Sequence, residues 1–413
     1  MLWGWGLKPL ITRGYLTVTD AENRIHHYGV SGSLPAVSIR LRDHALQWKL
    51  ALNPGLYFGE AYMNETLTIE SGTLHDLLNL FAINLSQTTP SMLDSLVEGV
   101  DFLTRAWQQY NPRARASANV RHHYDLSDAL YNTFLDADMQ YSCAYFPTAE
   151  TSLEEAQYLK KSHIAAKLRL EPGMRVLDIG CGWGGMAIYL AQETGVEVTG
   201  LTLSVAQTEK ARERVKKAGL EKQVKICLQD YREEKGTYDR IVSVGMFEHV
   251  GVRHYPEFFN KLRALLKPDG VALLHAIGRV DGPGTTNPWL RKYIFPGAYA
   301  PALSEVLAVI EHSDLWVTDI EILRLHYART LSEWHKRFNA RRNEVAAMYD
   351  EQFCRMWEFY LLSSEVDFRY LGTMVFQIQL TRDIEALPVT RDYMLDWERS
   401  RKSYVPLKQE QTT

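Results

Sequence analysis

The chain has 413 residues, which is too many for one small core and enough for two or three domains. Its composition, 46% hydrophobic and 23% charged, is typical of a soluble globular protein. The formal net charge of −4 gives no reason to expect a nucleic-acid partner.

Cysteine is scarce and scattered. Cys143, Cys181, Cys227 and Cys354 form no CxxC pair and have no metal-ligand spacing with histidine, so no metal site is expected. The N-terminal stretch MLWGWGLKPL lacks the charged leader of a secretory signal and is too interrupted to span a bilayer. We therefore expect a protein of the reducing cytoplasm.

The first hundred residues predict a small α+β module. Alternating apolar and polar residues indicate strands over 14–21, 36–43, 45–52 and 65–72, and a helix is expected over 74–85. Residues 97–120 are helical and then basic, with Arg113, Arg115 and Arg121 close together, and are interpreted as a linker. The predicted domains are thus 1–112 and 113–413.

From Thr151 the pattern changes to alternating helices and strands. Ser152 followed by Glu155 indicates a capping box that opens a helix, and Pro172-Gly173 ends it. Strands and helices then alternate over 175–278, which is typical of a doubly wound parallel α/β sheet. Strands predicted over 315–323 and 373–381 could close its far edge, with the helices between them as an insert.

A glycine-rich loop follows the first strand of this sheet. The strand ends at Asp178, and Gly180, Gly182 and Gly184 follow at alternate positions, where the backbone can approach a ligand without interference from Cβ. No Walker lysine follows, which disfavours a nucleoside triphosphate site. Dinucleotide enzymes remain a rival interpretation, although they usually carry an acid where this chain has the sequence LTLS over 201–204.

The sequence VLDIGCGWGG resembles motif I of the class I S-adenosylmethionine (SAM) methyltransferases. Together with TLSVAQ it is similar to the cyclopropane-fatty-acyl-phospholipid synthases and their mycolic acid relatives. Further matching segments, such as YSCAYF, LQDYR, MFEHVG, LLHAIG, LHYARTL and FQIQL, follow in the family's order across residues 120–382. The resemblance implies a Rossmann-like SAM-methyltransferase domain with a helical insert over 113–413, and a lipid-engaging α+β domain over 1–112.

The resemblance also implies which residues meet SAM. These cofactor-binding candidates are Tyr141, Ser142, Asp178, Gly180, Gly182, Gly184, Thr202, Leu203, Gln207, Gln229, Asp230 and Tyr231.

Adding a methylene group to an alkene places particular demands on an active site. Attack of the double bond on the sulfonium methyl leaves a carbocation, which must be kept dry, stabilised by aromatic faces, and deprotonated by a modest base. The aromatic candidates are Tyr145, Phe146, Trp183, Phe247, Tyr293, Phe295 and Tyr327.

Glu248 is the candidate base, because it follows an apolar strand and should emerge at that strand's carboxyl end. The family resemblance implies that a bound bicarbonate ion accepts the proton. Its matching ligands here are Cys143, Glu248, His275 and Tyr327, with the backbone amide of Ile277. His249 is interpreted as structural.

One position departs from the family. Relatives often carry a cysteine before the FR dipeptide, where this chain has Ser364. Alkene methylation needs no covalent intermediate, so we expect an active enzyme without that thiol.

The resemblance implies unsaturated phospholipids as substrate, peripheral association with the inner face of the membrane, and a homodimer. Basic stretches over 111–123 and 335–344 are candidate headgroup contacts or ordinary solvated surface. Alternatives are a SAM-dependent fatty-acyl C-methyltransferase that leaves a methyl or methylene branch, methylation of a small amine, and a non-enzymatic lipid- or SAM-binding protein.

Overall fold

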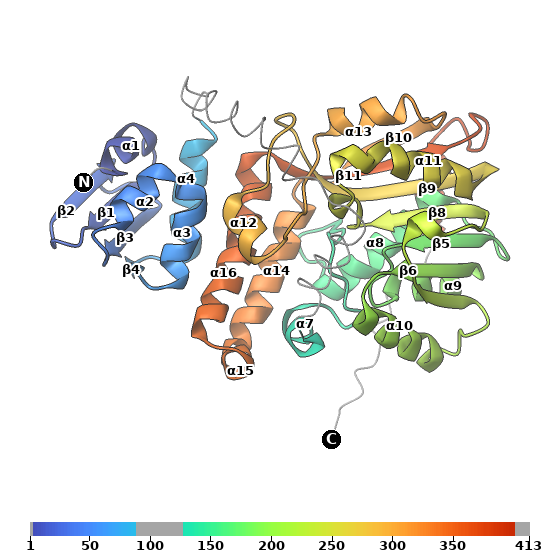
Figure 1. Cartoon of the computed structure of the whole chain (residues 1–413), viewed down its shortest axis with the longest axis horizontal. Coiled ribbons are helices and arrows are strands. Elements are labelled where there is room, and N and C mark those ends of the chain that lie inside the picture. The colour runs from blue at the N-terminus through green and yellow to red at the C-terminus, as the bar shows by residue number, and fades with distance from the viewer. Residues whose placement is uncertain (1–2, 88–126, 401–413) are drawn as a thin grey trace. The chain divides into compact units, whose positions relative to one another are not determined.

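The computed structural model describes residues 3–87 and 127–400 (Figure 1). The predicted linker, the boundary at residue 112 and the three arginines at 113, 115 and 121 lie outside the described residues. The chain forms two compact units, and each is built from separated segments. The first contains the described residues of 1–105 with 284–296 and 331–373, and the second contains the remainder.

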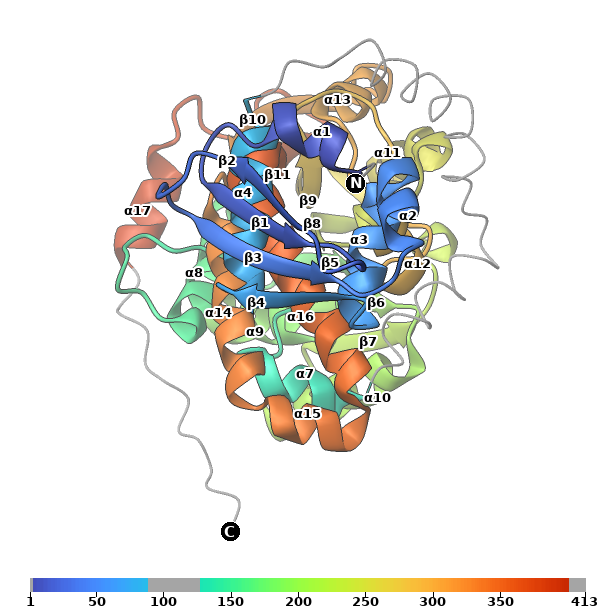
Figure 2. The ribbon, with the colours of Figure 1, turned by 90° about the vertical axis from the view of Figure 1, so that its left-hand side faces the viewer.

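The first unit contains a four-stranded sheet with the order β2-β1-β3-β4, seen side by side in Figure 2. Strand β1 is antiparallel to β2 and parallel to β3, and β4 is antiparallel to β3. The elements of this part are α1 (Trp3–Leu10), β1 (Tyr15–Thr19), β2 (Ile25–Gly29), β3 (Ala36–Leu41), α2 (Leu46–Leu52), α3 (Pro54–Met63), β4 (Leu67–Ser71) and α4 (Leu74–Leu85).

The strand predicted over 45–52 is wrong, because these residues form helix α2. Leu46 and Leu50, four residues apart, are both buried, as expected for one face of a helix. The alternation in ALQWKLAL fitted a strand as well, and a stretch this short does not separate the two periods. Strand β2 had no predicted counterpart.

The helices predicted as an insert between the last two strands pack in this first unit. They comprise most of α14 (His326–Ala340), α15 (Arg342–Met348), α16 (Glu351–Val366) and a short π-helical turn, η4 (Asp367–Leu371). Helix α12 (Pro288–Tyr293) joins them, and its Trp289 donates Nε1–H to Met63 Sδ at 3.2 Å and lies edge-on to Phe359 at 4.7 Å. The unit therefore depends on contacts between segments that are far apart in the sequence.

The second unit contains the predicted α/β sheet. Among the described residues it has seven strands in the order β10-β11-β9-β8-β5-β6-β7. Its strands are β5 (Arg175–Ile179), β6 (Glu197–Thr202), β7 (Val224–Leu228), β8 (Tyr238–Val244), β9 (Leu266–Arg279), β10 (Trp316–Ile322) and β11 (Thr373–Thr381). Strands β5 to β9 are parallel, and β10 and β11 close the far edge as predicted.

Helices cover both faces of this sheet (Figure 1). They are α8 (Leu153–Leu168), α9 (Gly185–Thr194), α10 (Val205–Lys217), α11 (Tyr255–Leu265), α13 (Leu303–Ile310) and α17 (Asp392–Ser400). The unit also contains helix α7 (Asp128–Phe134) and the short turns η1 (Tyr231–Glu233), η2 (Phe247–His249) and η3 (Val252–His254). Leu177 packs in the core on the side of α11 and α13, and Val176 packs on the side of α8 to α10. Neighbouring side chains of a strand thus face opposite cores.

Strand β5 lies between β6 and β8, so the chain winds outward from it in both directions. In such sheets the crevice at the carboxyl ends of the central strands is the usual ligand site. The glycine loop leaves the sheet at this point.

Candidate functional site

The glycine loop is fixed to the neighbouring strand. Gly180 has a φ of +85°, a left-handed conformation that favours glycine, and a Cβ there would lie 2.7 Å from Met246 Cβ. The amides of Gly180 and Cys181 both donate to the carbonyl of Leu201 at 2.9 Å. The loop therefore turns sharply at the end of β5 and leaves room beside it.

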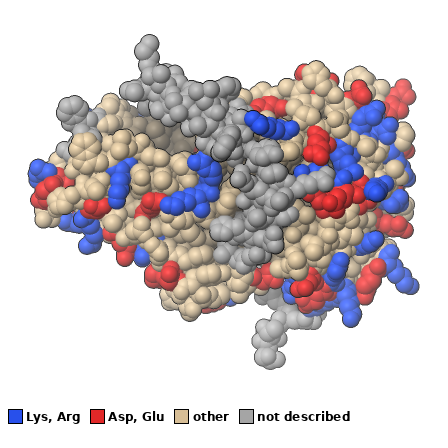
Figure 3. All heavy atoms as spheres, viewed as in Figure 1, with Lys and Arg blue, Asp and Glu red and all other residues tan. Residues whose placement is uncertain are grey.

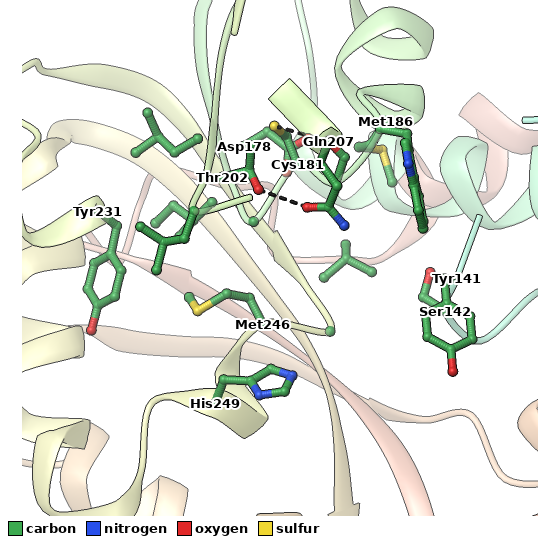
Figure 4. A pocket seen from close by; sticks show the side chains of 18 of the residues that line it. Tyr141, Ser142, Asp178, Cys181, Met186, Thr202, Gln207, Tyr231, Met246 and His249 are labelled. Atoms are coloured by element: carbon green, nitrogen blue, oxygen red, sulfur yellow. Dashed lines mark hydrogen bonds between the residues drawn. The ribbon is translucent and has the colours of Figure 1, made fainter. Parts of the chain in front are cut away.

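A pocket occupies that room (Figure 4). It is bounded by residues 139–142, the glycine loop, the ends of β6 and β7, and the turn after β8. It is lined by every predicted cofactor residue except Gly184, namely Tyr141, Ser142, Asp178, Gly180, Gly182, Thr202, Leu203, Gln207, Gln229, Asp230 and Tyr231.

Gly184 has a different position. It precedes the first residue of α9 with a φ of +80°, and a Cβ there would lie 3.1 Å from Ala211 Cβ. This glycine permits close packing of α9 against α10 and is not among the residues that line the pocket.

Polar groups along the pocket are held by local hydrogen bonds. Thr202 Oγ1 donates to Gln207 Oε1 at 2.8 Å, drawn in Figure 4, where Tyr231 lies at one end of the view and Tyr141 at the other. Asp230 accepts Arg232 Nε–H at 2.9 Å. The carboxylate of Asp230 is thus paired with a side chain that sequence reasoning did not consider.

Asp178 is a buried carboxyl group in the wall of the pocket. Its Oδ2 has no hydrogen-bond partner among the described residues. Burial raises its pKa to about 7, while the positive charge of Lys160 acts in the opposite direction. An acceptor oxygen left open in this way suits a ligand that brings a donor or a positive charge.

Two side chains of α8, both missed by the sequence analysis, hold the segment that carries Tyr141. Gln157 Nε2 donates to the carbonyl oxygens of Gln140 at 3.1 Å and of Ser142 at 3.0 Å. Lys160 Nζ donates to Gln140 Oε1 at 2.6 Å and to Ser142 Oγ at 2.9 Å. Gln157 and Lys160 lie one turn apart and are completely buried, and we call them the α8 clamp.

Glu248 lies in the turn η2 after β8, between Met246 and His249, which both line the pocket. Its Oε1 accepts the main-chain N–H of Ile277 at 2.7 Å, while Gly245 N–H donates to the carbonyl of His275. The carboxylate thus takes a position that a carbonyl of β8 would occupy if the strand continued. Glu248 therefore depends on β9 for its orientation.

The second oxygen of Glu248, Oε2, is buried and has no partner among the described residues. Burial raises the pKa of this carboxyl to about 7, and the bond from Ile277 lowers it by less. Glu248 therefore has the acidity of a proton acceptor that works near neutral pH.

His275 belongs to β9, two residues before Ile277 and on the same side of the strand. It is buried, and its Nδ1 lies 3.1 Å from Nε2 of Gln377 on β11. Burial lowers its pKa to about 3, so the ring is neutral at physiological pH.

Cys143 and Tyr327 lie on a second pair of neighbouring segments. The amide of Ala144 donates to Thr330 Oγ1 at 3.0 Å, and the amide of Phe146 donates to His326 Nδ1 at 3.0 Å. These bonds join the segment of Cys143 to the N-terminal part of α14, which carries Tyr327. Burial raises the pKa of the Cys143 thiol well above its usual value, so the sulfur keeps its proton.

The aromatic candidates lie in several different parts of the molecule. Trp183 lines the pocket and lies edge-on to Tyr131 at 5.0 Å, and Tyr131 lies edge-on to Tyr141 at 5.3 Å. Phe247 is completely buried in the sheet core against Tyr255. The remaining candidates are placed as follows: Tyr145 between His163 and His326, Phe146 and Tyr327 buried in the second unit, and Tyr293 and Phe295 in the first unit.

His249 lines the pocket, although the sequence analysis interpreted it as structural. Ser364 and Cys354 both lie on α16 in the first unit. Over the described ranges, no group of three or more histidine, cysteine or acidic side chains could hold a metal ion.

The basic stretch 335–344 is largely ion-paired within the first unit. Lys336 lies 2.7 Å from Glu333, Arg341 lies 2.6 Å from Glu344, and Arg342 lies 2.9 Å from Glu358. On the face of the molecule drawn in Figure 3, basic and acidic side chains are interspersed over the described parts. The stretch 111–123 lies outside the described residues. None of the helices that the structure describes is long and apolar enough to cross a bilayer.

Comparison with known proteins gives a consistent family. A family model described as mycolic acid cyclopropane synthetase matches residues 111–378. The chain is 43% identical over 273 residues to the cyclopropane-fatty-acyl-phospholipid synthase of Escherichia coli K12, which covers 66% of this chain and 70% of that protein. It is 37% identical over 355 residues to the tuberculostearic acid methyltransferase UfaA1 of Mycobacterium tuberculosis, covering 83% of this chain and 82% of that protein.

Solved structures agree with the sequence comparison. The cyclopropane synthase MmaA2 from Mycobacterium tuberculosis matches with a TM-score of 0.62 at 33% identity, covering 65% of this chain and 98% of that one. The mycolic acid cyclopropane synthase CmaA1, complexed with SAH and CTAB, matches with a TM-score of 0.61 at 33% identity, covering 66% of this chain and 99% of that one. With its glycine loop, its sheet order and these relatives, the chain belongs to the cyclopropane-fatty-acyl-phospholipid synthase family of SAM-dependent methyltransferases.

Proposed function

We propose that this enzyme transfers a methylene group from SAM to the cis double bond of an unsaturated phospholipid acyl chain and forms a cyclopropane ring. The carboxyl group of Glu248 carries the proposal. It is buried beside the pocket, one oxygen is held by Ile277, and the other has no partner among the described residues. Ring closure requires the loss of one proton from the methylated chain, and this group is suited to receive it.

The pocket at the end of β5 is the proposed SAM site. SAM supplies a methyl group on a positively charged sulfonium. The open carboxylate oxygen of Asp178 and the aromatic rings of Tyr141 and Trp183, all in this pocket, suit a cationic ligand. The SAH bound to the relative CmaA1 supports a SAM-type ligand for the fold.

We also propose that Cys143, Glu248, His275 and Tyr327 hold a bicarbonate ion. The side chains fit an anion, because the thiol of Cys143 keeps its proton and neutral His275 has one ring nitrogen that donates. The open Oε2 of Glu248 fits the hydroxyl group of such an ion. When bound, bicarbonate supplies a proton acceptor in a site closed to bulk water.

The amide of Ile277 has an indirect role in this proposal. It already donates to Glu248 Oε1 at 2.7 Å, so it holds the carboxylate rather than the ion. Because a backbone amide has one hydrogen to donate, Ile277 has none for the ion while this bond is kept.

We propose that the enzyme reaches its substrate at the inner, cytoplasmic face of the membrane by peripheral association, that domain 1–112 engages lipid, and that two copies form a homodimer. Exposed apolar side chains of the first unit support the lipid contact, since Leu34 is 84%, Trp48 56% and Leu52 81% exposed. Light scattering of the purified protein with and without liposomes tests both the dimer and the membrane association.

The reaction is tested by incubating the protein with SAM and liposomes that contain a mono-unsaturated phospholipid. Cyclopropanation adds one CH2 to the lipid mass and removes the double bond, which ozonolysis then fails to cleave. Samples without SAM and samples with the E248Q variant are the controls. A lipid that gains no mass under conditions in which SAM binds would contradict the proposal.

A second candidate is a SAM-dependent fatty-acyl C-methyltransferase that leaves a methyl or methylene branch. The similarity to tuberculostearic acid methyltransferase UfaA1 over 83% of the chain favours it, since the cyclopropane synthase match covers 66%. The two reactions share the methyl transfer to one alkene carbon, which leaves the cation on the other carbon. Ring closure then removes a proton from the new methyl group. A methylene branch needs a hydride shift to the cationic carbon before that methyl loses its proton, and a methyl-branched alkene loses a proton from a neighbouring chain carbon instead. A methylene branch retains an ozonolysis-sensitive double bond, so the same assay separates it from the ring.

A further inference from the structure

Gln377 contacts one of the proposed anion ligands from a distant part of the chain. Strand β11 lies beside β9 in the sheet, and this places Gln377 Nε2 3.1 Å from His275 Nδ1. The two residues are 1% and 2% exposed, respectively. No bulk water is therefore available to replace the hydrogen bond.

The ring of His275 is kept neutral by its surroundings. Burial opposes the imidazolium form and lowers the pKa, and the positive charges of Lys160, Lys167 and His163 act in the same direction. Glu321 acts in the opposite direction with the smallest effect. A neutral imidazole has one nitrogen that donates and one that accepts.

The side-chain amide of Gln377 determines which ring nitrogen of His275 carries the proton. Its Nε2 can only donate, so Nδ1 of His275 accepts and the ring proton lies on Nε2. The other end of the amide, Oε1, is buried without a partner among the described residues. Burying an amide with one unsatisfied acceptor lowers the stability of the fold. Stability therefore does not explain why glutamine stands here, and its bond to His275 indicates a role in holding that ring.

We propose that Gln377 is a positioning residue that keeps the proton of His275 on Nε2, so that this ring enters the anion site as a hydrogen-bond donor and never as the proton acceptor. The inference rests on the proposed function of that site. In this proposal His275 binds the anion, while Glu248 and the anion receive the proton. It also predicts that a residue which accepts a hydrogen bond at position 377 reverses the ring.

The tautomer is measured directly in the resting protein by 15N NMR of samples labelled at histidine. The His275 signals are those that disappear in H275N. We expect a protonated Nε2 and an unprotonated Nδ1 in the wild type, and the reverse in Q377E above neutral pH, where the carboxylate accepts from Nδ1–H. A protonated Nδ1 in the wild type would overturn the inference, whether or not the lipid reaction is found.

Turnover supplies the second test. At pH 8 the kcat of Q377E should fall by about 10- to 100-fold, with little change in the KM for SAM. As the pH falls toward 6, the pair formed by His275 and the introduced carboxylate gains a second proton, Nε2 again donates, and the deficit relative to wild type should shrink. Q377M, which matches glutamine in size and neither donates nor accepts strongly, should show a deficit that does not depend on pH.

The outcomes separate the two proposals. Equal deficits of Q377E and Q377M at every pH would mean that Gln377 only fills space, and the inference would fail. The expected NMR tautomers in a protein that makes no cyclopropane or branched lipid would contradict the proposed function and leave the placement of the proton intact. If Q377E does not fold, the wild-type spectrum alone decides.

Discussion

Glu248 accepts the main-chain N–H of Ile277 at 2.7 Å, so that a side-chain carboxylate extends the hydrogen bonding between β8 and β9 beyond the last residue of β8. The bond fixes one oxygen of the carboxylate and leaves the other available in a buried site. The position of this group thus depends on the register of two strands.

Replacing Glu248 with glutamine tests its role as a proton acceptor. Glutamine can still accept from Ile277 through its oxygen but has no basic oxygen to offer. We expect E248Q to bind SAM with wild-type affinity and to lose turnover by about 100-fold or more. Calorimetry of SAM binding and a lipid assay measure the two quantities, and normal turnover would show that the base lies elsewhere.

The rate should depend on pH through the same group. The pKa of Glu248 is about 7, because burial disfavours the ionised form, and only that form accepts a proton. In the wild type, kcat should therefore rise with pH and level off above about 7. A profile that is flat between pH 6 and 8, or that falls over this range, would contradict the assignment.

The free energy of unfolding should fall as the pH rises, whereas kcat should increase. The pKa of Glu248 is raised from 4.5 to about 7, so the native state binds this proton more tightly than the unfolded chain does. The resulting stabilisation is complete below about 4.5 and is lost as the pH rises through about 7, with an upper limit of about 3 kcal/mol. Urea unfolding at pH 5 and pH 8 should show a smaller loss for E248Q than for the wild type, and equal losses would contradict the burial of the charge.

Removing the α8 clamp should weaken SAM binding. Gln157 and Lys160 hold the backbone and side chains of residues 140 and 142, on either side of Tyr141. In Q157L and K160M that segment loses its support, and we expect the Kd for SAM to rise about 10-fold. K167M is the matched control, because Lys167 is also a buried lysine of α8 but pairs with Glu321. It should lose stability without losing SAM affinity, and an equal loss of affinity would refute the specific role of the clamp.

Gly185 should not tolerate alanine, although alanine favours helices. A Cβ at this first residue of α9 would overlap Gln140 Nε2 and lie 2.6 Å from Asp138 Oδ2. We expect G185A to displace the 138–140 segment, weaken SAM binding and lower the melting temperature. The control is G6A in α1, where a Cβ meets no atom within 4 Å and the higher helix propensity should raise stability by up to about 1 kcal/mol. If G185A melted at the same temperature as G6A, residues 138–140 would move aside at little cost and the prediction would be wrong.

Local patterns identified most of the sheet and the loop. Alternation of short apolar strands with longer helical segments over 175–278 predicted the α/β sheet, because this succession is typical of a parallel sheet with helices on both faces. The spacing of Gly180 and Gly182 after Asp178 located the pocket, since these features are neighbours along the chain. The stretch 45–52 was misassigned because so short a run fits both periods.

Residues that act through distant partners could not be found in this way. Gln377 is 102 residues from His275, and the α8 clamp reaches back 15 to 20 residues from its helix. In the sequence these are ordinary polar side chains of a strand and a helix. Their contacts appear only when β11 is placed beside β9 and α8 against the segment that carries Tyr141.

The sequence alone therefore determined most elements of the α/β sheet, the ligand loop and the family, because each depends on contiguous residues and their order. The tertiary structure decided the pKa values of the ionisable side chains. The pKa of Glu248 is raised to about 7 and that of His275 is lowered to about 3 because both side chains are buried, and burial is set by strands and helices that pack from remote parts of the chain. Charge and proton position are properties of that packing, which a linear pattern of residues does not encode.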